Sequence, residues 1–281
     1  MLTYTELPDR LKQIPDPPKQ LYIRGRSLPG LLSHPCVTVV GSRKVTPYGQ
    51  EVTQRLVSSL ARAGVVIISG LALGVDAIAH RAALEAGGLT IAVLPSSLDT
   101  IHPAANYQLA QRIAGQGALV SEYAPGARVQ KWNFVQRNRI ASGLCDALLI
   151  TEAGEKSGTL HTTSFALEQG RDVLAVPGNI TSPTSVGTNN LIKHGATPVT
   201  TADDILFAIG VSQTAAATTP IGNNAEEQLI IDLLKEGQAG LDQLRARTRL
   251  AASILSRTLT MLEIDGKIQG HAGAYWLNCY K

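Results

Sequence analysis

The chain has 281 residues, of which 44% are hydrophobic and 17% are charged, so it can bury a core and is not disordered by composition. Its 26 glycines and its low aromatic content of 4% favour an α/β protein with tight strand-to-helix turns over an aromatic-rich β-sandwich. The 25 basic and 22 acidic residues leave a net charge of +3. This charge neither requires nor excludes a nucleic-acid partner, so local clusters must decide.

No segment approaches ~18 consecutive apolar residues, which argues against a membrane-spanning helix. Residues 1–19 carry charges and four prolines, unlike the apolar centre of a secretion signal. Cys36, Cys145 and Cys279 lie far apart and form no Cys-x-x-Cys pair, so buried thiols are favoured over a disulfide or a zinc site. We therefore expect a cytoplasmic protein without a cofactor, a metal or a membrane partner.

Short apolar strands alternate with helical patterns along most of the chain. The expected strands are 37–40, 65–69, 90–94, 118–121, 147–151 and 173–176, and the helices between them are 48–63, 76–85, 106–114, 134–142 and 159–169. Strands separated by helices require right-handed crossovers and a mostly parallel sheet. The pattern predicts an α/β, Rossmann-like, doubly wound domain over residues 21–210, preceded by an N-terminal extension over residues 1–20.

A second domain is expected after residues 211–224, a segment without charge that is typical of a linker. Three helices are predicted at 226–234, 241–248 and 251–264, followed by a β-ribbon over 266–270 and 274–277. Three helices and a two-stranded wing are typical of a small winged-helix domain, which we assign to residues 225–281. Residues 225–281 hold seven basic and seven acidic residues, so this domain is neutral.

The first candidate site follows the strand at 37–40 and comprises Gly41, Ser42, Arg43 and Lys44. A glycine turn between a buried strand and a helix start concentrates free backbone N–H groups and the positive end of the helix dipole, which together suit a phosphate. Arg43 adds a bidentate donor and Lys44 a point charge. Anion binding is therefore favoured over a simple glycine turn with a capping serine.

The glycine-rich segment 70–76 follows the second strand and ends at Asp76, four residues before His80. Asp76 and His80 share a helix face, so an acid/base pair is conceivable. An aspartate that caps the next helix is the more common explanation, and we favour it.

Two later segments add donors that suit a nucleic acid. Residues 128–139 hold four cations and no acid, interleaved with aromatic rings, which suits a single-stranded backbone with stacked bases. Ser157, Gly158 and Thr159 open a helix with amides and hydroxyls that again favour a phosphate. The predicted DNA-binding residues in these two segments are Lys131, Phe134, Arg137, Asn138, Arg139, Ser157, Gly158 and Thr159.

Taken in order, these segments resemble the DprA/Smf family of bacterial DNA-processing proteins. The resemblance covers about residues 21–209 and rests on segments 39–43, 70–76, 98–106, 134–139, 152–160, 175–178 and 187–196. It implies an extended Rossmann-like domain that is not an enzyme, binds single-stranded DNA, protects incoming DNA, and helps load the RecA recombinase during natural transformation and recombination. It also implies a homodimer, with a contact near Leu191 and Ile192. A winged-helix C-terminal domain is common in this family.

Three other functions compete with single-stranded DNA binding. Phosphoribohydrolases share the fold, but an alignment on Gly158 and Thr159 puts Thr162 where their general acid/base glutamate stands, which argues against that enzyme. A nucleotide-binding sensor domain would keep the pocket without chemistry and stays open. A transcription factor would use the helix at 251–264, in which Arg257 is the only cation. The neutral domain instead favours a protein contact or a weak role in DNA binding.

Overall fold

The computed structural model describes residues 1–155, 157–211, 220–235, 237, 239–271 and 273–277. The chain divides into two compact units, unit 1 over Met1–Val211 and unit 2 over Ser212–Lys281. Residues 212–219, which make up most of the expected linker, lie outside the described residues.

Unit 1 is built on a mixed sheet whose strand order is β1-β2-β6-β5-β4-β3-β7-β8-β9 within the described residues. The strands from β6 to β9 in this order are parallel to one another, and β2 runs antiparallel to both β1 and β6. The strands are β1 (Leu2–Thr3), β2 (Gln20–Gly25), β3 (Cys36–Val40), β4 (Val66–Ser69), β5 (Thr90–Val93), β6 (Ala118–Ser121), β7 (Ala147–Ile150), β8 (Asp172–Ala175) and β9 (Thr197–Pro198). The expected doubly wound, mostly parallel fold is confirmed, and β1, β2 and β9 extend it at its edges.

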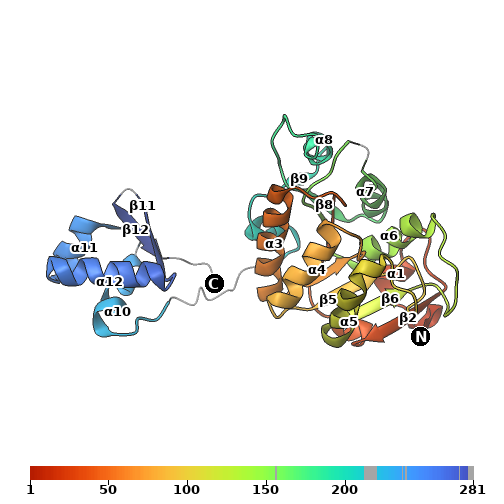
Figure 1. The fold of residues 1–281 in the computed structure, drawn as a ribbon, viewed down its shortest axis with the longest axis horizontal. Helices are drawn as coiled ribbons and strands as arrows, with labels where there is room; N and C mark the ends of the chain where they lie inside the picture. The colour runs from red at the N-terminus through yellow and green to blue at the C-terminus, as the bar shows by residue number, and fades with distance from the viewer. Residues whose placement is uncertain (156, 212–219, 236, 238, 272, 278–281) are drawn as a thin grey trace. The chain divides into compact units, whose positions relative to one another are not determined.

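Helices cover both faces of this sheet (Figure 1). They are α1 (Asp9–Lys12), α2 (Leu28–Leu31), α3 (Pro47–Arg62), α4 (Val75–Glu85), α5 (Tyr107–Gln116), α6 (Asn133–Leu144), α7 (Thr159–Glu168), α8 (Val186–Lys193) and α9 (Ala202–Ala208), with short 3-10 helices at Tyr4–Glu6 and Ala104–Asn106.

The alternation of side chains along β3 assigns these helices to their faces. Val37 and Val39 share a core with Leu56 and Leu60 of α3. Cys36 belongs to a second core that includes side chains of α6. Thr38 points to the same side as Cys36, because its hydroxyl donates to the carbonyl of Ala141 at 2.7 Å. The strand is therefore buried on both faces, as parallel strands between helical layers are.

Residues 1–20 were expected to form an extension but are packed into unit 1. Leu7, Leu11 and Ile14 are buried in the core that also holds Ile140 and Leu144 of α6. Polar contacts fix the same segment, since the Nη1 atom of Arg10 donates to the carbonyl oxygen of Leu144 at 2.7 Å. The segment therefore belongs to the Rossmann-like unit.

Unit 2 has the expected winged-helix elements, namely α10 (Ala225–Leu234), α11 (Leu241–Thr248), α12 (Ala252–Ile264), β11 (Ile268–His271) and β12 (Ala274–Leu277). A short strand that the sequence did not reveal, β10 (Ala239–Gly240), completes a sheet of order β10-β12-β11. Leu244 of α11 packs with Leu255, Leu259 and Leu262 of α12 in the core of this unit.

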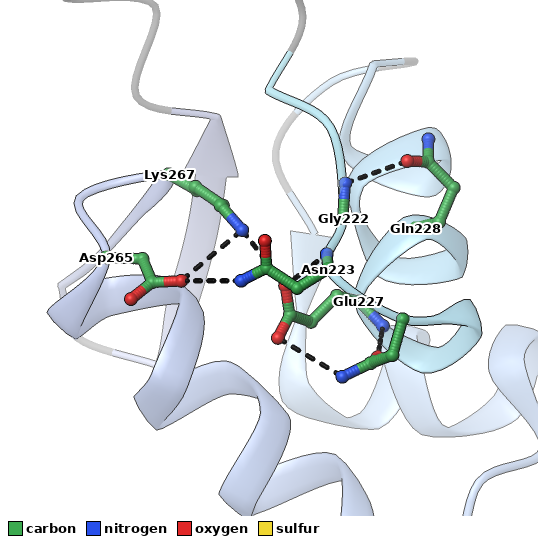
Figure 2. Close-up of polar contacts among 7 residues, drawn as sticks. Gly222, Asn223, Glu227, Gln228, Asp265 and Lys267 are labelled. Carbon is green, nitrogen blue, oxygen red and sulfur yellow. Dashed lines mark hydrogen bonds and ion pairs between the residues drawn. The ribbon is translucent and has the colours of Figure 1, made fainter.

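The last residues assigned to the linker are part of unit 2. The side chain of Asn224 accepts from the backbone N–H of Glu227 at 2.8 Å and caps α10. The backbone N–H groups of Gly222 and Asn223 donate to Gln228 and Glu227 (Figure 2). These three residues are thus hydrogen-bonded to a backbone N–H and to two side chains in the first turns of α10. The folded unit therefore begins before residue 225.

Candidate nucleic-acid interface

The strand order of unit 1 reverses at β3, because β4 lies on one side of it and β7 on the other. In open α/β sheets, ligands bind beyond the carboxyl ends of the strands at such a switch point. A cleft of about 540 Å³ opens at this place. It is lined by Val40, Gly41, Ser42, Arg43, Lys44, Ala72, Asp76, Phe134, Val135, Arg137, Asn138, Gly154, Ser157, Gly158, Thr159, His161 and Thr162.

Ten of the twelve predicted DNA-binding residues line this cleft, and Lys131 and Arg139 do not. The ten come from three segments that are far apart in the sequence and meet at one edge of the sheet. Among the described residues, the cleft lining contains three permanent cations, Arg43, Lys44 and Arg137, and a single carboxylate, Asp76. Its charge therefore suits an anionic ligand.

The loop that carries Arg43 is fixed by its backbone. The N–H of Ser42 donates to the carbonyl oxygen of Glu152 at 2.8 Å, and the carbonyl of Ser42 accepts from the N–H of Val75 at 3.1 Å. Arg43 and Lys44 are exposed and form no ion pair within the part of the chain that the structure describes. Both cations are thus presented from a held loop, and the charge of Arg43 acts on the buried Asp76 carboxyl, where it helps to oppose the rise in pKa that burial causes.

The structure corrects the expectation that a helix dipole contributes to anion binding at this loop. Helix α3 begins only at Pro47, where Thr46 is the N-cap. The Glu152 carboxylate already occupies that end of the helix, because it accepts from the backbone N–H of Thr46 at 2.9 Å and from its hydroxyl at 2.7 Å. The hydroxyl of Ser42 does not cap the helix and instead closes a turn on Lys44. Charge, rather than the α3 terminus, is what the first loop offers to an anion.

Asp76 does not cap α4 in the expected way. The N-cap is Gly74, with φ of 79°, and a Cβ there would lie 2.2 Å from the carbonyl oxygen of Ser42. Asp76 is buried, and its carboxylate accepts from the N–H groups of Gly70 at 3.1 Å and Ala72 at 3.3 Å. Burial raises the pKa of this carboxyl, while the charge of Arg137 and the two N–H donors oppose the rise. Asp76 shapes the glycine-rich loop.

His80 does not lie in the cleft lining. Its Nδ1 atom lies 2.7 Å from the hydroxyl oxygen of Thr90, which itself donates to the carbonyl of Ile67. A hydroxyl has one proton, so the histidine must donate through Nδ1. Burial, followed by the charge of Arg137, lowers the pKa of His80 to about 3. This ring is a neutral core group, and the geometry gives no support to an acid/base pair with Asp76.

Arg137 is buried at the floor of the cleft. Its Nη1 atom donates to the carbonyls of Gly70 and Val93. Gly70 directly follows β4, and Val93 is the last residue of β5. Its Nε atom donates to the Asn138 side chain at 3.1 Å. These bonds hold the guanidinium at the carboxyl end of the sheet, so its charge is fixed below the cleft.

The structure does not place Arg139 in the cleft. Its Nε atom lies 2.9 Å from Asp16, and its Nη2 atom lies 2.5 Å from Glu122. The side chain is buried and bound to two carboxylates, so its charge is neutralised inside unit 1. The prediction for Arg139 is therefore corrected to a structural ion pair that ties α6 to the N-terminal segment.

Of the aromatic and basic residues at the start of α6, some line the cleft and others do not. Phe134 lines the cleft and also a neighbouring cavity of about 160 Å³, where its ring packs edge-on against His102 with centroids 6.5 Å apart. Lys131 and Trp132 precede the helix and are exposed outside the cleft wall. Phe134 is therefore the aromatic ring placed to meet a ligand.

The N-terminus of α7 also lines the cleft. Ser157, Gly158 and Thr159 line the cleft as expected, and the first turn of α7 contains no acidic residue. The hydroxyl of Ser157 accepts from the N–H of Thr159 at 3.3 Å. Lys156, which precedes these residues, lies outside the described residues. This helix end supplies the positive dipole that α3 does not.

His161 and Thr162 were not predicted as site residues but line the cleft. Both belong to the first turn of α7, so their positions three and four residues after Gly158 could have indicated this. Leu191 and Ile192 lie on α8 and are half-buried, and Leu191 packs against a core that contains Leu148 and Ile150.

Three observations concern other predicted properties. Within the described residues, no helix is both long and apolar enough to cross a membrane. The same residues contain no group of three or more histidine, cysteine or acidic side chains placed to hold a metal ion. Cys36 and Cys145 are buried free thiols, and Cys279 lies outside the described residues.

Fold and cleft together define a Rossmann-like protein with a cationic cleft at the switch point and a winged-helix unit. Comparison with family models matches residues 1–210 to DNA recombination-mediator protein A and residues 213–274 to the DprA winged helix domain. The chain therefore belongs to the DprA/Smf family of DNA-processing proteins.

Individual relatives agree with this assignment. The chain is similar to DprA of Bacillus subtilis, with 42% identity over 71% of this chain and 67% of the relative, and to Smf of Escherichia coli, with 45% identity over 71% and 53%. It spans 63% of the length of the Mycobacterium tuberculosis relative, with 37% identity over 84% of this chain.

Two solved structures are also similar. DprA of Streptococcus pneumoniae has a TM-score of 0.68 and 42% identity, and the match covers 72% of this chain and 70% of that one. DprA of Helicobacter pylori has a TM-score of 0.67 and 35% identity, over 72% of this chain and 92% of that one. The latter structure concerns the single-stranded DNA binding mode of the Helicobacter protein.

Proposed function

We propose that the chain binds single-stranded DNA in the cleft of unit 1, through phosphates and with little sequence preference. The observation that carries this proposal is the cleft lining, which among the described residues joins Arg43, Lys44 and Arg137 to an α7 terminus without acids and contains Asp76 as its single carboxylate. Exposed cations on a fixed loop and a helix N-terminus both favour an anion. The Helicobacter pylori relative, whose structure concerns single-stranded DNA binding, supports a polymer as the ligand.

Arg43 is the residue on which this proposal depends most. Its loop is fixed by Ser42, and the exposed guanidinium forms no ion pair within the described ranges, although its charge acts on Asp76. Hydrogen bonds to charged groups contribute about 1.5–3 kcal/mol, so removal of this side chain should weaken binding about ten- to a hundredfold. Lysine keeps the charge but loses the bidentate geometry, so it should recover part of the loss.

The limited sequence preference follows from the donor types. Backbone amides, hydroxyls and guanidinium groups contact phosphates, which are the same at every nucleotide. Phe134 can stack against any base, because every base has a π face. Asn138 is fixed by Arg137 and supplies an amide at the cleft wall.

We further propose that the cleft binds without catalysis. A glycosidic cleavage needs a positioned carboxylate as general acid or base. The carboxylate of Asp76 is bonded to two backbone N–H groups of its own loop, and Thr162 stands where the related hydrolases place a glutamate. Binding, protection of DNA and help in loading the RecA recombinase are then the functions that membership of this family supports.

A homodimer is proposed through the late part of unit 1, near Leu191 and Ile192. Both side chains are half-buried within one copy, so each keeps apolar surface for a second copy. Light scattering at tens of micromolar should give the mass of a dimer, and substitution of Ile192 by aspartate should give a monomer. A monomeric mass for the unsubstituted chain would contradict this part of the proposal.

The central experiment compares Arg43→Ala, Arg43→Lys and Arg55→Ala in binding to a labelled single-stranded oligonucleotide. Arg55 is an exposed arginine of α3 outside the cleft lining, so its removal controls for net charge. Affinity should fall strongly for Arg43→Ala, partly for Arg43→Lys and little for Arg55→Ala, with unchanged melting temperatures. Equal effects at Arg43 and Arg55 would refute a specific site.

Two further measurements separate a polymer site from a mononucleotide site. The logarithm of the affinity for single strands should fall with the logarithm of salt concentration, with a slope near ~0.7 per neutralised phosphate. A mononucleotide should compete only weakly against the labelled strand. Affinity that does not depend on salt, or full competition by a mononucleotide, would favour a nucleotide sensor instead.

A further inference from the structure

The charges of unit 2 are separated along the chain, although they sum to zero between residues 225 and 281. Residues 243–262, which include most of α11 and α12 and the turn between them, contain four arginines and no acid. The seven acids of residues 225–281 all lie outside this stretch, at Glu226, Glu227, Asp232, Glu236, Asp242, Glu263 and Asp265. The neutral total therefore conceals a cationic helix-turn-helix.

The two described lysines of this unit, Lys235 and Lys267, form ion pairs with its acids. The Nζ atom of Lys267 lies 3.1 Å from Glu227 and 3.3 Å from Asp265, and Asn223 also donates to Asp265 (Figure 2). The Nζ atom of Lys235 lies 2.7 Å from Asp232. Both of these lysines therefore pair with acids that lie outside residues 243–262.

Three of these arginines, Arg245, Arg249 and Arg257, are exposed and form no ion pair in the described part of unit 2. Arg247 has an interaction of its own and is not counted. Arg249 ends α11 in the left-handed region, with φ of 57°, and its N–H donates to the carbonyl of Arg245 at 3.0 Å. Two of the three cations therefore lie at the turn, and the third lies in the first half of α12.

The exposed side of α12 changes in character along its length. Its first half presents Arg257 together with the exposed serines Ser253 and Ser256, which can donate to phosphates. Its second half exposes Met261 and Ile264 around an acid. In helix-turn-helix proteins, the N-terminal residues of the second helix enter the major groove while the preceding element contacts the backbone. The N-terminal half of α12, which carries Arg257, is thus the half that contacts DNA in this kind of docking.

We propose that the α11–α12 helix-turn-helix is a second nucleic-acid site, which binds the phosphate backbone of duplex DNA. This site lies in unit 2 and does not depend on the cleft of unit 1. Three phosphate contacts predict a slope near −2.7 in a plot of log affinity against log salt, because B-DNA gives about −0.9 per contact. Binding should then weaken about fortyfold between 50 and 200 mM salt.

The test uses the full chain and a labelled blunt-ended duplex of about 30 base pairs, measured at 50–200 mM salt in the presence of excess unlabelled single strand that fills the cleft. The variant R245Q/R249Q/R257Q removes the three charges and keeps side chains of similar length. The control R55Q/R62Q/R112Q removes three exposed arginines from the outer helices of unit 1, none of which lines the cleft.

The unit 2 variant should bind the duplex at least tenfold more weakly at 50 mM salt, with a flatter salt dependence. The control should change duplex affinity less than twofold, and both variants should keep the wild-type affinity for a single strand and the wild-type melting temperature. Equal losses in the two variants, an unchanged affinity in the unit 2 variant, or no duplex binding by the unsubstituted chain would each overturn the proposal. Failure of the cleft proposal would appear separately, as single-strand binding that is insensitive to Arg43→Ala.

Discussion

The buried histidine of α4 should make the stability of unit 1 depend on pH. His80 donates through Nδ1 to Thr90, and its Nε2 atom is buried without a partner among the described residues. A second proton on this ring would have to reside at Nε2, in an apolar interior near the Arg137 charge. Folded His80 therefore stays neutral at any pH at which the protein is handled.

The size and the direction of the effect follow from the two pKa values. Burial lowers the pKa of His80 to about 3 in the folded chain, while an unperturbed histidine titrates near 6.5. Between these values the unfolded chain binds a proton that the folded chain does not, so stability falls as pH falls. The slope approaches about 1.4 kcal/mol per pH unit well below pH 6.5, and the loss between pH 6.5 and 5.0 is about 1.6 kcal/mol, because the unfolded histidine is half protonated at pH 6.5. Above about pH 7.5 this contribution is constant.

Urea unfolding of the wild type and of His80→Asn at pH 8.0, 6.5 and 5.0 measures this contribution. The asparagine amide can still donate to Thr90 but does not titrate, and the carboxylates that titrate in both proteins cancel in the difference. The variant should lose about 1.6 kcal/mol less than the wild type between pH 6.5 and 5.0. Parallel pH profiles for the two proteins would refute the neutral assignment of His80.

Three other predictions address the fold and the site. Leu11→Ala should destabilise unit 1 by about 2–5 kcal/mol in urea unfolding, because this fully buried side chain joins the N-terminal segment to α6, and an effect below about 0.5 kcal/mol would contradict that packing. Gly74→Ala should displace the loop carbonyl of Ser42 and weaken single-strand binding, whereas Gly87→Ala, at a similar positive φ with no atom near its Cβ, should cost stability alone. A chain that ends at Val211 should keep its single-strand affinity, since the proposed single-strand cleft is lined by residues of unit 1, and a folded fragment that loses this affinity would show that unit 2 contributes.

The elements that could be predicted from the sequence are those with strong local patterns. The apolar run at Val37 is short and bounded by turns, and the helix after Pro47 has a clear apolar face, so both were expected close to where they lie. The segment around Leu11 gave no such signal, because prolines interrupt it and its apolar residues lack a period. It folds through contacts with α6, more than a hundred residues later, and no local pattern contains that information.

The same limit applies to the predicted site. Arg137 and Arg139 stand two positions apart in a basic stretch, and nothing local distinguishes them. Arg139 is neutralised by Asp16 and Glu122, which only the folded chain brings to it. Glycine-rich turns after parallel strands were easier to interpret, because the topology places all of them at one edge of the sheet.

The attachment of the first residues to α6 has a consequence for synthesis on the ribosome. Arg10 pairs with Asp146 at 3.3 Å, and Asp16 pairs with Arg139, so both partners of the N-terminal segment are translated long after it. At about 5–20 residues per second, the roughly 130 residues between these positions take about 7–26 s to emerge. Throughout that interval Leu7, Leu11 and Ile14 lack their native core and are accessible to chaperones. A nascent chain arrested before α6 should therefore be cleaved by protease within residues 1–20, and a chain arrested well after Asp146 should be protected there.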